Sequence, residues 1–389
     1  MSDILTRTKQ ILAELVAFPS ISADGNRAVT EHIAALLDAS GVRYWLEPDA
    51  TGAKLNLFAT IGPDGTGGVI LSGHTDVVPV EGQPWTSDPF AMAERDGRLY
   101  GRGTCDMKGF VAACIAMAPV FAARDLKVPV HFAFTYDEEV GCFGAQALTQ
   151  SLTASGIKPA AAIIGEPSMM QPVEGHKGCF EYTTRFTGLE GHGSSPDLGV
   201  NAVEYAAIWA QKLVALREAL KARAPQSSAF VPPHSTINIG LLSGGVAHNV
   251  IPGAARMEWE MRPVTPEDAA FVKTELAALR DALLPKMRAV YPDAAIETET
   301  IAEVVGLMPD PASPATRLVM ELTGANRAGL VPFGTEAGLF QEIGIPSVIC
   351  GPGDIAQAHK PDEFLSLDQL AACLTMLEKL ADRLERGAL

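Results

Sequence analysis

Six side chains of the types that bind divalent metal ions are spread along this 389-residue chain, and most of them follow a short apolar run. The six are His74, Asp106, Glu138, Glu139, Glu166 and His359. Imidazole nitrogens and carboxylate oxygens are the ligands that hydrolytic metal centres use. Two imidazoles and three carboxylates, one of them shared, can hold two metals, and the sixth side chain can then act as a general base.

Each of these residues also has an ordinary structural explanation. In the motif His74-Thr75-Asp76, the imidazole could bind a metal while Asp76 holds its other ring N–H, or the histidine could cap a turn. Asp106 lies in the glycine-rich stretch GRGTCDMKG. There it could bridge two metals about 3.5–4 Å apart. Taken alone, Asp106 is better explained as the N-cap of a helix that begins near Gly109.

The acidic triplet Asp137-Glu138-Glu139 ends a run of aromatic and aliphatic residues. Three adjacent carboxylates repel one another, and metal cations would offset that repulsion at a buried strand end. A solvated acidic turn is the alternative. The spacing does not decide which glutamate binds a metal and which stays free.

The repetition of one sequence context favours a single metal site over six separate explanations. Glu166 follows the apolar run AAAIIG, where a lone buried charge would need a partner, and His359 lies in the loop GPGDIAQAHKPDEF. Motifs of other chemistries are absent from the sequence: there is no Walker A motif, no dinucleotide fingerprint and no nucleophile elbow.

The apolar runs predict the elements that would position these residues. The runs VILSGH, VHFAFTY, AAAIIG and SVIC are typical of buried parallel strands, and helices are predicted over 26–40, 109–123, 314–322 and from 368 onward. This alternation indicates an α/β fold with a mixed, mostly parallel sheet flanked by helices. Such sheets bind ligands at the carboxyl ends of their strands, so one crevice could gather the whole set.

The pattern changes between about 180 and 301. Predicted strands over 180–186, 235–241, 254–262 and 295–301 alternate polar and apolar residues, and two long helices are predicted over 200–221 and 266–290. This order indicates an inserted α+β domain with one solvated sheet face. The predicted division is therefore 1–180 with 302–389 for the larger domain and 181–301 for the insertion.

Composition limits the partners of the chain. The net charge of −16 argues against binding to nucleic acid or to an anionic membrane surface. The N-terminal segment has no signal-peptide pattern, and no uninterrupted apolar stretch of membrane-spanning length is expected. The six cysteines form no C-x-x-C pair, so buried thiols in a reducing, cytoplasmic setting are expected.

Seven motifs in combination resemble those of the M20 metallopeptidases, a family of co-catalytic dizinc amidohydrolases. In order, they are SGHTDVVP, GRGTCDMKGF, DEEVG, GEP, GLEGHGSSP, GGVAHNVIPG and AHKPDEF. The resemblance covers nearly the whole chain and implies a zinc-peptidase-like catalytic domain that holds two Zn²⁺ ions. By ligand type Co²⁺ or Mn²⁺ could replace them. It further implies that 181–301 is a lid through which the chain forms a homodimer.

The resemblance also implies a role for each candidate ligand. His74 and Glu166 would bind one zinc, Glu139 and His359 would bind the other, and Asp106 would bridge the two. Following the same pattern, the peptide bond after Asp106 would be cis.

Further roles follow from the same motifs. Glu138 would be the general base, and Asp76 would hold His74. His192 resembles the lid histidine that reaches the partner subunit's site and polarises the scissile carbonyl. Asn249 and Arg262 match lid residues that hold the substrate, and Arg262 suits a carboxylate; a surface strand arginine is the alternative.

Within the family, the segment 333–365 is most similar to the acetylornithine deacetylases. Desuccinylases typically carry Ser-Asp-Gly-Arg-Phe where this chain has Thr-Glu-Ala-Gly-Leu over 335–339. The reaction that the resemblance implies is hydrolysis of an N-acetyl amino acid, N2-acetyl-L-ornithine above others, to the free amino acid and acetate. Another deacylase or dipeptidase specificity, or a metal-binding protein without catalysis, is the alternative. Glu336 would lie near the substrate ammonium or merely begin a helix.

Overall fold

The structure, a computed structural model, describes residues 2–64 and 67–388, which form two compact units. Unit 1 contains the chain up to Gly175, the segment Leu307–Val331 and the chain from Thr335 onward. Unit 2 contains His176–Gly306 and the short segment Pro332–Gly334. These limits lie slightly outside the predicted 181 and 301, because strands β9 (Cys179–Thr187) and β14 (Ala295–Val304) both extend beyond the predicted range.

Unit 1 is built on an eight-stranded sheet whose order is β1-β2-β6-β3-β7-β16-β8-β15. Its strands are β1 (Arg43–Pro48), β2 (Leu55–Ile61), β3 (Val69–His74), β6 (Val130–Thr135), β7 (Ala161–Pro167), β8 (Val173–His176), β15 (Gly329–Val331) and β16 (Ser347–Gly351). The four central strands β6, β3, β7 and β16 run parallel, whereas β1 and β2 are antiparallel at one edge. The predicted mixed sheet is confirmed.

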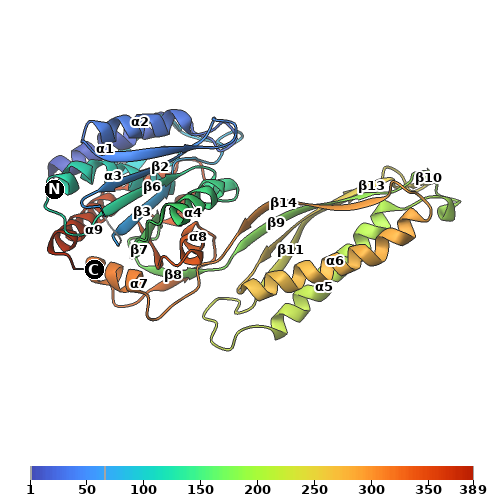
Figure 1. The fold of residues 1–389 in the computed structure, drawn as a ribbon. Helices are drawn as coiled ribbons and strands as arrows, with labels where there is room; N and C mark the ends of the chain where they lie inside the picture. The colour runs from blue at the N-terminus through green and yellow to red at the C-terminus, as the bar shows by residue number, and fades with distance from the viewer. Residues whose placement is uncertain (1, 65–66, 389) are drawn as a thin grey trace. The chain divides into compact units, whose positions relative to one another are not determined.

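Helices cover both faces of this sheet (Figure 1). The helices are α1 (Ser2–Val16), α2 (Arg27–Asp38), α3 (Gly109–Ala122), α4 (Phe143–Ser155), α7 (Pro314–Thr323), α8 (Ala337–Glu342) and α9 (Leu367–Arg386). Val69 and Leu71 of β3 pack into the core that contains α1, α2, α3, α7 and α9, while Ile70 packs into the core that contains α4 and α8. Because both faces are covered, the strands are continuously apolar in sequence.

The segment Thr104–Ala122, which includes α3, is long and apolar enough to cross a membrane by length and composition alone. The segment is not an uninterrupted apolar stretch, because it contains Asp106 and Lys108. Most of the segment is core: 83% of its most apolar window is buried inside the protein. The high hydropathy of α3 has a structural cause, since the helix contacts α1, α9 and the sheet at once.

Unit 2 consists of an antiparallel sheet with one face covered by two long helices (Figure 1). The strand order is β11-β13-β9-β14, with β11 (Thr236–Gly244) and β13 (Ala254–Arg262), and the helices are α5 (Ala202–Ala222) and α6 (Pro266–Arg288). Asn201 and Thr265 cap the two helices with their side chains. The predicted α+β insertion with one solvated sheet face is confirmed.

A second, small sheet in unit 1 was not predicted. It joins β4 (Ala93–Arg95), β5 (Arg98–Tyr100) and β17 (Phe364–Ser366), and Phe364 pairs with Tyr100. The three strands are too short to produce a visible sequence pattern. Their pairing brings the loop after His359 against the glycine-rich loop that precedes Asp106.

Candidate metal centre

The predicted ligands lie where neighbouring parallel strands end. His74 is the last residue of β3, Glu138 and Glu139 form the turn after β6, and Glu166 is near the end of β7. His359 lies in the loop that follows β16. Parallel strands of one sheet have their carboxyl ends at the same edge, so residues far apart in sequence meet there.

A close contact between strand and helix precedes Glu166. A Cβ atom at Gly165 would lie 2.0 Å from Cδ1 of Phe110 on α3, far inside van der Waals contact. Only glycine lets β7 pass this ring at its observed position. The position of Glu166 therefore depends on the absence of a side chain at the residue before it.

Asp106 lies between the two imidazoles. Its Oδ1 is 3.1 Å from Nε2 of His74, and its Oδ2 is 3.3 Å from Nε2 of His359. Nε2 of His359 is also 3.0 Å from Oε2 of Glu139, and Nε2 of His74 is 3.7 Å from Oε1 of Glu166. One carboxylate thus faces two groups of ligands, which is the arrangement that a shared ligand requires.

The donor atoms fit metal ions. Ligand atoms of His74, Asp106 and Glu139 lie within 4.8 Å of one another, as do those of His74, Glu138 and Glu166. Oε1 of Glu166 is buried and has no hydrogen-bond partner among the residues that the structure describes. An unpaired buried carboxylate oxygen is costly, and a bound cation would provide its partner.

The electrostatics of the cluster also favour cations. Burial, followed by the negative charge of Asp106, raises the pKa of Glu139 to about 7. Burial likewise holds the pKa of Glu138 and Glu166 well above the usual range. Hydrogen bonds to Asp106 and Glu139 raise the pKa of His359 to about 10. The cluster carries more negative potential than its two imidazoles neutralise, so it suits metal cations.

The predicted contact between Asp76 and His74 is different in detail. Nδ1 of His74 is 2.9 Å from the backbone oxygen of Asp76 but 3.7 Å from its carboxylate, which is too long for a hydrogen bond. The carboxylate instead accepts hydrogen bonds from Ser22 Oγ and from the backbone N–H groups of Glu138 and Glu139. Asp76 therefore fixes both the imidazole and the acidic turn, the first through its backbone and the second through its side chain.

Glu336 is not available to a substrate ammonium in this structure. Its side chain is fully buried and accepts hydrogen bonds from Ser72 Oγ at 2.6 Å and from Thr135 Oγ1 at 2.9 Å. Ser72 lies two residues before His74 on β3, and Thr135 ends β6. The predicted substrate contact is therefore replaced by a structural one, in which Glu336 holds together the ends of two ligand-bearing strands.

The lid residues belong to unit 2. His192 is exposed on β10 (Gly191–His192), which pairs with β12 (Val250–Ile251), so Asn249 lies beside it. Nδ1 of His192 is 2.7 Å from Oγ of Ser194. Arg262 ends β13 and forms an ion pair with Glu260 at 2.7 Å. The structure brings His192 and Asn249 together at the two-stranded sheet β10-β12, whereas Arg262 lies in the four-stranded sheet, at the end of β13 that is farther from β12.

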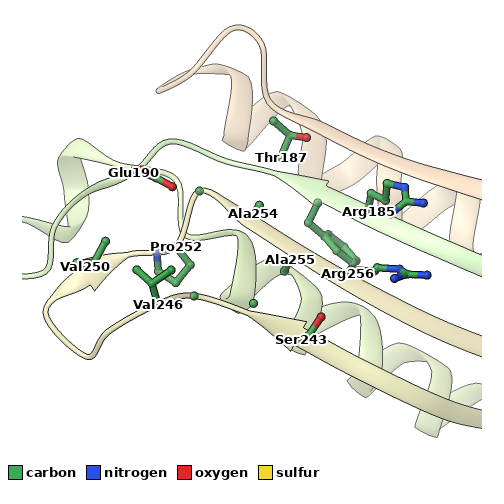
Figure 2. Close-up of a pocket in the computed structure, with 14 residues that line it drawn as sticks. Arg185, Thr187, Glu190, Ser243, Val246, Val250, Pro252, Ala254, Ala255 and Arg256 are labelled. Carbon is green, nitrogen blue, oxygen red and sulfur yellow. The ribbon is translucent and has the colours of Figure 1, made fainter.

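A hollow of about 460 Å³ in unit 2 contains none of the predicted site residues (Figure 2). Arg185 and Arg256, on neighbouring strands, are among the residues that line it. Each arginine already forms an ion pair, with Glu299 and Glu258 respectively. The two arginines are therefore already paired, and Glu190 is the other charged residue of the lining.

Three buried or half-buried residues that contact the ligand loops were not predicted from the sequence: Gln83, Arg102 and Glu363. Glu363 is within the motif AHKPDEF, four residues after His359, and Arg102 is within GRGTCDMKG. Their positions inside two recognised motifs were the available signal. The peptide bond between Asp106 and Met107 is cis, as the resemblance implies.

Comparison with known proteins gives the class of the chain. The sequence pattern of Peptidase family M20/M25/M40 matches residues 70–383. The fold is similar to that of an M20 metallo-carboxypeptidase from Sulfolobus solfataricus, with a TM-score of 0.74 and 18% identity over 96% of this chain and 98% of that one. It is also similar to a dinuclear metal-binding M20 peptidase from Bacillus subtilis, with a TM-score of 0.67 and 20% identity over 99% of each.

The chain belongs to this M20 family and is a metallohydrolase of the M20 fold. Among curated relatives, the acetylornithine deacetylase of Proteus mirabilis is 36% identical over 365 residues, which is 92% of each chain. The acetylornithine deacetylase of Myxococcus xanthus is 36% identical over 97% of this chain and 98% of its own length.

Proposed function

We propose that the chain is a dizinc amidohydrolase that converts N2-acetyl-L-ornithine and water into L-ornithine and acetate. The observation that carries this proposal is the position of Asp106 between His74 and His359, with an acidic residue beside each imidazole. Both relatives described above are acetylornithine deacetylases that match over more than nine-tenths of the chain.

In this reaction His74 and Glu166 would hold one metal, Glu139 and His359 would hold the other, and Asp106 would be the ligand that both share. The bound metals supply positive charge that polarises the carbonyl and makes water acidic. Glu138 takes the proton of the attacking water and returns it to the leaving amine. Burial raises the pKa of Glu138, and a raised pKa favours the return of the proton to the leaving amine.

His192 donates a hydrogen bond to the oxygen of the attacked carbonyl as negative charge develops there. Arg262 binds the substrate carboxylate, for which a guanidinium offers two parallel N–H groups. Asn249 lies next to His192, so its side-chain amide binds the same end of the substrate as His192. Groups other than Glu336 bind the ammonium of ornithine, because the side chain of Glu336 is fully buried.

Two features of unit 2 support a homodimer in which His192 acts on the partner subunit's centre. The nine residues of β13 separate Arg262 from the end near His192 by roughly 27 Å, too far for one small substrate to contact both from the same chain. Strand β11 is the edge of its sheet and exposes Leu241 and Leu242. An unpaired edge strand with apolar side chains suits pairing with a second copy.

The six cysteines are free thiols, which supports the proposed cytoplasmic setting, since reducing compartments keep thiols from pairing.

The substrate preference is tested by comparing kcat/KM of the zinc-loaded protein across a panel. The panel contains N2-acetyl-L-ornithine, other N-acetyl amino acids, N-succinyl-diaminopimelate and dipeptides.

The highest kcat/KM is expected for N2-acetyl-L-ornithine. A higher value for a dipeptide or for the succinyl compound would reject the proposed substrate while keeping the metallohydrolase class. No turnover of any panel member with two zinc ions bound would instead favour the non-catalytic alternative.

A further inference from the structure

We propose that Glu363, together with Arg102 and Gln83, is a positioning network that holds the shared ligand Asp106 and the ligand His359 in place and thereby sets the metal affinity. None of the three is a predicted ligand or substrate contact. The inference rests on the proposed metal centre and deepens it, because it names the residues that act through the ligands.

The first part of the network is the carboxylate of Glu363, which is fully buried. Its Oε1 accepts hydrogen bonds from the backbone N–H groups of Cys105 at 2.8 Å and of Asp106 at 3.0 Å. Its Oε2 accepts from the N–H of Gly103 at 2.9 Å and from Nη1 of Arg102 at 2.8 Å. One side chain thus fixes the backbone from which the Asp106 carboxylate projects.

The second part is Arg102, whose side chain is only 1% exposed. Its charge compensates that of Glu363, which a buried carboxylate requires. Nη2 of Arg102 donates to Oε1 of Gln83 at 2.7 Å, and the guanidinium lies 5.1 Å from the ring centre of Trp85. Arg102 therefore links Glu363, which binds the Asp106 loop, to the segment that contains Gln83.

The third part is the amide of Gln83. While its oxygen accepts from Arg102, its Nε2 donates to the backbone oxygen of His359 at 3.0 Å. His359 is 55% exposed and has a positive φ of 61°, which is uncommon for a residue with a side chain. Such a loop needs contacts from outside to keep one conformation. Gln83 supplies one of them.

The network connects the backbone of the shared ligand Asp106 with His359, the residue that the Asp106 carboxylate faces. It runs from Asp106 through Glu363, Arg102 and Gln83 to His359, while Oδ2 of Asp106 faces Nε2 of His359 at 3.3 Å. Groups that orient metal ligands from behind typically change metal affinity or activity by about 10–100-fold when they are altered. An effect of that size is expected here.

The test compares Glu363→Gln with the unchanged protein. Glutamine keeps the shape but presents an NH₂ group to donors that need an acceptor, so Asp106 loses its fixed position. Zinc affinity, measured by competition with a chelator of known affinity, should fall about 10–100-fold. At saturating zinc, kcat should remain reduced while KM stays near its original value, because no substrate contact is lost.

A matched control separates positioning from loss of stability. Val319→Ala removes buried side-chain volume from α7 in the same unit, away from the ligand loops, and should lower the melting temperature with little change in zinc affinity. A Glu363→Gln variant that loses no more zinc affinity than Val319→Ala, with both folded at the assay temperature, would overturn the proposal.

If Glu363→Gln does not fold, the half-buried Gln83 carries the test. Gln83→Ala should fold and weaken zinc binding several-fold, and an unchanged affinity would count against the network. The zinc titration needs no substrate. If the protein fails to hydrolyse N2-acetyl-L-ornithine but these variants lose zinc affinity, the proposed substrate is wrong and the positioning network stands.

Discussion

At the scale of single residues, the chemistry of this chain depends on which carboxylates already accept hydrogen bonds from neighbouring groups and which do not. Asp106 has two imidazoles on its two oxygens, whereas Asp76, Glu336 and Glu363 are occupied by hydrogen bonds from neighbouring donors. Among residues 2–64 and 67–388, the one hydrogen-bond donor to the Glu138 carboxylate is the thiol of Cys142, a weak contact. Among the described acids of the centre, it is the one best placed to exchange protons.

The substitution Glu138→Gln tests this role. The amide cannot accept a proton, so kcat should fall about 10²–10⁴-fold, the usual contribution of a general base. Zinc content, measured by elemental analysis, should stay at the level of the unchanged protein because Glu138 is not needed as a ligand. Loss of one zinc ion would instead identify Glu138 as a ligand, and substantial residual activity would exclude it as the base.

A second prediction at this scale concerns pH and His131. Burial lowers the pKa of His131 to about 4, and its Nδ1 is 3.0 Å from Oγ1 of Thr60. The unfolded chain binds the proton at a higher pH than the folded one, so this residue lowers stability as pH falls from 6.5 towards 4. Its full effect is about 3 kcal/mol.

In the variant His131→Asn, the free energy of unfolding should depend less steeply on pH within that window. Urea denaturation at pH 7, 6 and 5 measures the difference between the two proteins. Curves that run parallel from pH 7 to 5 would show that His131 does not titrate in this way.

At the scale of elements, the metal centre is a consequence of parallel strands that end at one edge. Strands β3, β6, β7 and β16 each bring a ligand or the loop that carries one, and α3 follows directly after the Asp106 loop. The apolar runs of the sequence predicted these strands and their buried character. The order in which they pair, β6-β3-β7-β16, came only from the structure, because continuous apolar runs pair equally well in any order.

The contact between β7 and α3 is testable at Gly165. In Gly165→Ala the new methyl would collide with Phe110, so β7 must shift and move Glu166 with it. The free energy of unfolding should fall by about 1–3 kcal/mol, the range for overpacked cores. Zinc affinity should fall as well, because the predicted ligand Glu166 is the residue directly after Gly165 and would move with the strand.

The control is Gly329→Ala on the edge strand β15, where the nearest atom to a new Cβ would be 4.0 Å away. Urea denaturation and zinc titration of both variants provide the comparison. Equal stability of the two alanine variants would contradict the close contact at Gly165.

At the scale of the whole molecule, the chain is two units with separate cores. Unit 1 holds every predicted metal ligand, and unit 2 holds His192, Asn249 and Arg262. Within unit 2, His192 is in the two-stranded sheet β10-β12, close to the start of β13, whereas Arg262 is the last residue of β13. The proposed homodimer resolves this separation, because each centre would receive His192 from the partner subunit.

Mixing two inactive variants tests the exchange. His192→Ala lacks the lid histidine and Glu138→Gln lacks the base, so each homodimer should be nearly inactive. A mixed dimer would have one complete centre, and a 1:1 mixture refolded together should recover about a quarter of full activity. Each variant refolded alone is the control. No recovery, with mixed dimers demonstrated by mass, would show that His192 acts within its own chain.

The sequence by itself determined the local features of this protein. Apolar periodicity predicted most strands and helices, and residue types at strand ends predicted a metal cluster, since both depend on short-range patterns. The same patterns could not distinguish the backbone contact of Asp76 from a side-chain contact. Nor could they show that Glu336 would be enclosed between Ser72 and Thr135, 264 and 201 residues away in sequence.

Only the tertiary structure decided which groups surround each ligand. The pairing of β17 with β5, three residues on each side, brings Glu363 to the backbone of Asp106 across 257 residues of sequence. The enclosure of an acid or an arginine depends on packing from distant segments, and no local pattern encodes it. The six residues of metal-binding type can therefore be found in the sequence, whereas the acids and amides that hold them in place are found only in the fold.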